Sequence, residues 1–232
     1  MFVSQIARGY RLIAGLWALH QDHALLHGNQ LTLPKGHPVK NLSVLSLGLV
    51  VALASVVTLN AEEAATKALK SGPQMGDSIG AFNVTKLCGA EEDGVKEGKN
   101  LCYRCKNGSK PQVMVFTRST DKKVVELVKK LDGAITKHED ASLRAFVNLL
   151  GEDKDDVKES AKKFAAKSGA KNIPFVIPNE FENGPDNYGI NAKAEITIVM
   201  ASSKGVKANH SFASAKDLNV DAVIADLAKI VE

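Results

Sequence analysis

Apolar and polar positions along residues 75–232 follow two periods, one typical of buried strands and one typical of amphipathic helices. Short apolar runs predict strands at residues 79–84, 112–117, 143–150, 173–177, 195–200 and 206–212. Apolar side chains at helical spacing predict helices between Asp121 and Gly133, over residues 153–168 and over residues 220–231. Ser119, Thr120 and Asp121 are candidate N-caps for the first of these helices.

Two loop-rich segments interrupt this order. Residues 88–111 are rich in Gly, Lys, Asn and Cys, and residues 178–189 are rich in Pro, Asn and Gly. The alternation of strands and helices predicts parallel pairing with right-handed crossovers, and the last two strands form an antiparallel hairpin. The sequence therefore predicts an α/β fold with a mixed central sheet and helices on both faces.

The chain is expected to carry a leader before this domain. Residues 42–59 hold no charge, Lys40 precedes them, and a polar, acidic stretch follows Ala61. This pattern predicts a secretory signal peptide over residues 39–61, cut after Ala61, and hence a periplasmic or extracellular bacterial protein. The alternative is an uncleaved membrane anchor, since 18 apolar residues nearly span a bilayer. Membrane association is expected only in that case.

The segment before the leader matches neither a signal peptide nor a domain. We expect translation to begin at Val39, so that residues 1–38 are not part of the native protein. The alternative is a real but disordered extension. Residues 62–73 then form a helix-prone linker that ends at Gly72-Pro73, and residues 74–232 form one domain.

The charge of the chain argues against a nucleic-acid partner. The chain has 30 basic and 26 acidic residues, and four of the basic and one of the acidic residues precede residue 62. The remaining 26 and 25 nearly cancel, whereas a nucleic-acid-binding domain needs a basic stripe. No P-loop or dinucleotide fingerprint is present either, so no cofactor is expected.

The candidate chemistry lies in three cysteines, Cys88, Cys102 and Cys105, all within the first loop-rich segment. Cys102 and Cys105 form a Cys-x-x-Cys, and nearby Arg104, Lys106 and Lys110 favour a thiolate there. The pair is predicted to be either a redox-active dithiol, with Cys88 as a possible resolving thiol, or a structural disulfide of an oxidising compartment.

Two further interpretations remain open for the cysteines. A metal site would need a fourth ligand beside the three thiolates, and His138 or His210 could supply it. Haem attachment normally needs Cys-x-x-Cys-His, and Lys106 stands in place of the histidine. We expect neither group as a resident cofactor.

The order of elements from Gln112 onward resembles the thioredoxin-like superfamily. The opening Met75-Gly76-Asp77 with Phe82 is similar to the entry of peroxiredoxin-like proteins, and residues 188–199 with the following turn look like the lead into the last thioredoxin strands. The leader together with LCYRCKNG at residues 101–108 is similar to exported thioredoxin-like proteins of planctomycete-type bacteria. The resemblance covers residues 74–232 and implies a three-layer thioredoxin-like fold.

The chain departs from that family at two positions. Thioredoxins place Cys-x-x-Cys after the first central strand, where residues 118–122 here contain no cysteine. Their cis-proline position falls at about Ala194, so a trans peptide is expected. The resemblance therefore implies thiol exchange with other exported proteins at a displaced pair. The alternatives are a non-catalytic binding or scaffold module and a metal-binding module.

Overall fold

The computed structural model describes residues 69–232. The predicted extension, the signal peptide and the first part of the linker lie outside the described residues. Within the described part, no helix combines the length and the apolar character that crossing a membrane requires. Ser71 is 1% exposed, and its hydroxyl lies 2.6 Å from that of Thr197. Residues before Gln74 therefore also pack against the domain.

A seven-stranded sheet forms the centre of the domain, with the strand order β2-β1-β5-β4-β3-β6-β7. The three strands β3, β4 and β5 are parallel, and β1, β2, β6 and β7 each run antiparallel to their neighbours. The mixed sheet is thus confirmed. The strands are β1 Val84–Cys88, β2 Asn100–Leu101, β3 Gln112–Thr117, β4 Arg144–Leu149, β5 Phe175–Pro178, β6 Ile196–Ser202 and β7 Gly205–Phe212.

Helices occupy most of the connections between these strands. The α-helices are α1 Tyr103–Asn107, α2 Lys122–Lys137, α3 Lys154–Ser168, α4 Val220–Ala225 and α5 Ala228–Val231, and the 3-10 helices are η1 Glu91–Asp93, η2 Asp186–Tyr188 and η3 Ala215–Asp217. Asp121 caps α2 by accepting from the N–H of Lys123 at 3.0 Å, and Asp153 caps α3 by accepting from Asp155 and Asp156. The cap at Asp121 was expected from the sequence.

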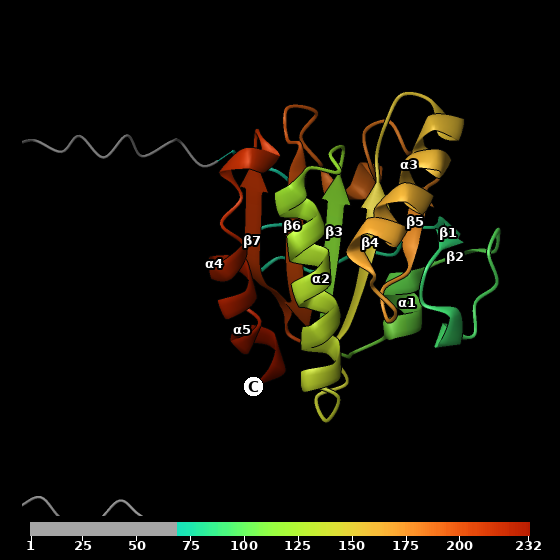
Figure 1. The fold of residues 1–232 in the computed structure, drawn as a ribbon. Helices are drawn as coiled ribbons and strands as arrows, with labels where there is room; N and C mark the ends of the chain where they lie inside the picture. Colours follow the sequence, from blue (N-terminus) through green and yellow to red (C-terminus); the bar gives the residue numbers. More distant parts are fainter. Residues whose placement is uncertain (1–68) are drawn as a thin grey trace, which may run out of the picture. The chain divides into compact units, whose positions relative to one another are not determined.

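One face of the sheet carries the long helices. The crossovers β3–α2–β4 and β4–α3–β5 step across the sheet in the same direction, so right-handed connections place α2 and α3 on the same face. Figure 1 shows α2 and α3 on one side of the sheet. The apolar sides of both helices, together with those of α4 and α5, lie in one core with the sheet. Phe164 of α3, for example, packs edge-on against Phe175 of β5 at 5.1 Å.

The other face is covered by shorter segments. Tyr103 of α1, Tyr188 of η2 and the loop residue Phe82 fill a second core there. The ring of Phe82 lies 5.9 Å from that of Phe116 on β3 and 4.7 Å from that of Tyr188. Helices therefore cover both faces, as predicted, and the domain has three layers of unequal thickness.

Three predicted boundaries were wrong. The strand predicted at residues 79–84 begins only at Val84, and Ile79 and Phe82 are buried loop residues. Helix α2 continues past Gly133, because burial of Ala134 and Ile135 offsets the roughly 1 kcal/mol helix penalty of a glycine. The final helix is interrupted at Asp226, whose carboxylate lies 3.0 Å from His210 of β7.

Candidate functional site

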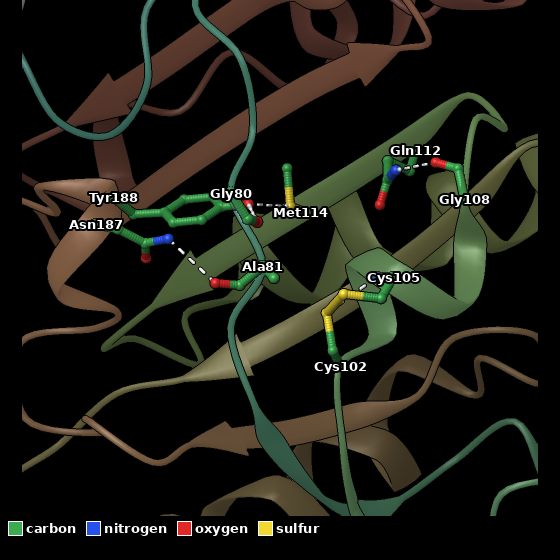
Figure 2. The surroundings of a disulfide bond; sticks show 9 residues. All are labelled: Gly80, Ala81, Cys102, Cys105, Gly108, Gln112, Met114, Asn187 and Tyr188. Atoms are coloured by element: carbon green, nitrogen blue, oxygen red, sulfur yellow. Dashed lines mark hydrogen bonds between the residues drawn. A yellow bond between two sulfur atoms is a disulfide. The ribbon is translucent and has the colours of Figure 1, made fainter.

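Cys102 and Cys105 form a disulfide at the beginning of α1, with their Cα atoms 5.2 Å apart. Cys102 is the N-cap of this helix, and its Sγ accepts a hydrogen bond from the backbone N–H of Cys105 at 3.0 Å (Figure 2). Cys105 is exposed and Cys102 is half-buried. The sulfur–sulfur bond is therefore open to solvent rather than packed beneath the loop.

Packing against the sheet sets the position of α1. Tyr103, between the two cysteines, is 3% exposed, and its ring stacks on Phe146 of β4 at 5.7 Å. The side-chain amide of Gln112, at the start of β3, donates to the carbonyl of Gly108 just after α1. The disulfide consequently lies at the amino end of β3, on the face with the shorter cover.

A buried charge network holds the segment before α1. Lys86 of β1 is 2% exposed, and its ammonium donates to Asp93 Oδ1 at 2.8 Å and to the carbonyls of Ala90 and Val95. All three ammonium protons have acceptors, which a buried charge requires. The hydroxyl of Tyr103 donates to the second oxygen of Asp93. Burial, with this hydrogen bond, raises the pKa of Tyr103.

Sequence reasoning missed Lys86 and Asp93. A signal existed for Lys86, because it stands two residues after Val84 in a short strand and therefore on the same face as that buried side chain. Asp93 gave no such signal, since it lies among other acidic residues of a loop.

Cys88 is separated from the disulfide by its environment. It is 9% exposed and packs in the core beneath the long helices, whereas Tyr103 packs in the core on the other face. Burial raises the pKa of the Cys88 thiol to about 11, and Glu97 adds to the rise. A buried, protonated thiol is a poor nucleophile. These features do not favour Cys88 as a resolving thiol.

The predicted metal ligands do not come together. Within residues 69–232, no three side chains of the His, Cys, Asp and Glu types gather around a common point. His138 ends α2 as its C-cap, and His210 contacts Asp226. Neither histidine completes a ligand set with the cysteines, so the geometry gives the metal interpretation no support.

The end of β3 where thioredoxins carry their cysteines has a different composition. Arg118, Ser119 and Thr120 line a cavity of about 410 Å³ between the β3–α2 and β4–α3 loops. Arg118 donates to the carbonyl of Glu182 at 2.6 Å, and desolvation lowers the pKa of its guanidinium. The peptide bond before Ala194 is trans, as expected, since residues 69–232 contain no cis bond. This end of the sheet holds no thiol.

Comparison with known proteins gave structural likeness only. No family model and no curated protein matches the chain. An uncharacterised conserved protein from Geobacillus kaustophilus is similar in structure at 12% identity, over 71% of this chain and 86% of that one, with a TM-score of 0.50. AhpC from Mycobacterium tuberculosis has 16% identity over 67% and 96% of the two chains, with a TM-score of 0.48.

The exposed lipoprotein thioredoxin from Streptococcus pneumoniae has 15% identity over 65% of this chain and 100% of that one, with a TM-score of 0.44. Identities this low concern the fold alone. The strand order carries the assignment: parallel β3 and β4, with β6 antiparallel to β3 and β7 antiparallel to β6, are followed by closing helices. Residues 69–232 therefore have a thioredoxin-like fold.

Proposed function

We propose that this protein is an exported bacterial thiol–disulfide exchange protein that acts through Cys102 and Cys105 on disulfides of other exported proteins. The observation that carries the proposal is the exposure of the pair. Cys105 is exposed and Cys102 half-buried, so a partner sulfur can approach. A reactive disulfide must be accessible, whereas a structural one is better protected by burial.

In the proposed reaction Cys102 is the attacking residue. With the pair reduced, the Cys102 thiolate attacks a partner disulfide, forms a mixed disulfide and releases one partner thiolate. Cys105, as thiolate, then attacks the Cys102 sulfur and releases the second. The partner disulfide is reduced to two thiols, and the Cys102–Cys105 bond is formed. The Cys105 N–H that points at Cys102 Sγ favours negative charge on that sulfur.

A second candidate function has its own support. Tyr103 is buried, and its hydroxyl is tied through Asp93 to the buried Lys86. A short helix anchored in this way could be a rigid element of a non-catalytic binding module, with the disulfide as a staple.

The reduction potential distinguishes the two functions. The full chain and its Cys88→Ala variant would be equilibrated in glutathione buffers and their thiols trapped. A potential near or above about −230 mV, equal in both proteins, is expected of a working oxidoreductase. A potential below about −300 mV would favour the structural staple.

Export has a separate test. N-terminal sequencing of the native protein should find Glu62 as the first residue, because the proposed cut follows Ala61. A peptide from residues 1–38 in the native protein would contradict the proposed start at Val39.

A further inference from the structure

A cavity of about 240 Å³ lies beside the helix that carries the disulfide. Tyr103, Lys106 and Asn107 of α1 line it together with Lys110 and Arg144. Tyr103 and Asn107 are buried, whereas Lys106 and Lys110 are exposed at the rim. The lining of the cavity therefore combines buried side chains of α1 with exposed lysines.

The charges that line this cavity do not cancel. Its two acidic residues are Glu92 and Asp93, and Asp93 is already paired with Lys86 at 2.8 Å. Across residues 69–232, none of Lys106, Lys110 and Arg144 forms an ion pair. The Arg144 guanidinium donates a hydrogen bond to the carbonyl of Leu143. Three cations thus face one uncompensated carboxylate.

The cavity and the disulfide share one short helix. Lys106 follows Cys105 directly, and Tyr103 follows Cys102 directly. A group bound in the cavity therefore lies within about one helix diameter, roughly 10 Å, of the two sulfurs. A disulfide substrate of modest size can span that distance while its own sulfur reaches Cys102.

We propose that this cavity binds substrate carboxylates, so that the substrates of the Cys102–Cys105 pair are disulfides with acidic groups a few atoms from sulfur. The inference rests on the proposed function for its chemistry and on the unpaired cations for its selectivity. Lys106, Lys110 and Arg144 attract the anionic substrate and hold it beside the pair. Arg144 is also able to bind a carboxylate in a bidentate manner.

Three small disulfides of similar length and different charge test the selectivity. Reduced full-length protein would react with dianionic 3,3′-dithiodipropionate, neutral bis(2-hydroxyethyl) disulfide and dicationic cystamine at about 10 mM salt, where screening is weak. In the triple variant Lys106→Gln/Lys110→Gln/Arg144→Gln, the ratio of the rate toward the dianion to the rate toward the neutral probe should fall about tenfold. The ratio is the readout because any loss of thiolate slows the reaction with both probes alike. Added salt at 0.5 M should abolish the difference between variant and wild type.

A matched control carries the same change of charge at the other end of the sheet. Lys122, Lys154 and Lys193 are exposed residues at the starts of α2 and α3 and just before β6. The variant Lys122→Gln/Lys154→Gln/Lys193→Gln should retain the wild-type preference. Equal losses in both triple variants, or no preference in the wild type, would overturn the cavity as the selective element.

A sulfur-free probe separates this inference from the proposed function. Suberate has the length and charge of dithiodipropionate but no disulfide, so its binding to the oxidised protein needs no exchange. At about 10 mM salt we expect suberate to shift the backbone amide NMR signals of the buried cavity residues Tyr103 and Asn107 in the wild type but not in the cavity variant. Suberate binding without disulfide exchange would support the anion site and contradict the proposed redox function. Disulfide exchange without suberate binding or charge preference would support the redox function and contradict the anion site.

Discussion

The ammonium of Lys86 and the carboxylate of Asp93 lie 2.8 Å apart beneath the loop that leads to the disulfide helix. Lys86 is almost fully buried, and Asp93 is 16% exposed. Asp93 also accepts from the Val95 N–H at 2.7 Å and from the Tyr103 hydroxyl. One carboxylate thus joins β1, the loop and α1.

Removal of this carboxylate should destabilise the domain strongly. Asp93→Asn leaves the buried Lys86 charge without a counter-ion, and the expected cost is about 3 kcal/mol in the free energy of unfolding. Urea unfolding followed by circular dichroism measures it. Asp93→Asn combined with Lys86→Met should recover part of the loss, because no buried charge then remains. Glu159→Gln, which breaks the exposed pair with Lys163, serves as the control and should leave the midpoint unchanged.

Tyr103→Phe isolates the hydroxyl. The ring can still stack on Phe146, but one oxygen of Asp93 loses its donor. We expect a loss of about 1–2 kcal/mol in the free energy of unfolding, with the disulfide still formed in the oxidised protein. Urea titration and thiol counting measure the two quantities. An unchanged unfolding midpoint would show that the hydrogen bond contributes nothing.

Cys88 should make the protein lose stability in alkali. Its folded pKa of about 11 lies above the ordinary value of 9.0, so the unfolded state releases the thiol proton first. Stability is therefore complete below about pH 9 and falls as the pH rises toward 11, by about 2–3 kcal/mol from this group. Cys88→Ala should show a shallower decline between pH 8.5 and 10, below the range where Tyr103 and Tyr188 contribute. Both proteins would carry Cys102→Ser and Cys105→Ser so that no disulfide reshuffles.

Arg118 tests which end of the sheet carries the chemistry. Its Nη1 donates to Glu182, but its Nε and Nη2 are buried without a partner within the described part of the chain. Arg118→Leu removes one hydrogen bond and two unpaired donors, so we expect less than about 1 kcal/mol change in stability. The reduction potential of Cys102–Cys105 should not move, because the pair lies at the opposite end of β3. A shifted potential would contradict the separation of the two ends.

Much of the fold was predictable because its determinants are local. Residues 113–116 are continuously apolar and lie in β3. Asp153 caps the start of α3, and Gly169, in a left-handed conformation, ends it. The predicted boundaries were wrong where contacts between residues distant in sequence determine the end of an element. Gly133 signals a helix end locally, but the residues after it pack into the core.

The position of Cys88 near the candidate site also depends on contacts that the local sequence does not reveal. Strict alternation in β1 would place Cys88 on the face of Val84 and Lys86. A shift of register between Lys86 and Cys88, against β5, instead turns Leu87 and Cys88 together into the core of the long helices. No pattern within five residues predicts such a shift, because the partner strand lies almost ninety residues further along the chain.

The sequence by itself determined the α/β class, the N-cap of α2, the displaced Cys-x-x-Cys and the lack of cysteine after β3. These follow from residue types and short spacings. Only the tertiary structure decided that Cys102 and Cys105 are open to solvent, that Cys88 is not, and that Lys86, Asp93 and Tyr103 meet. The reason is that exposure and ion pairing depend on which distant segments cover a side chain. Local periodicity predicts a buried face but does not identify the residues that will pack against it.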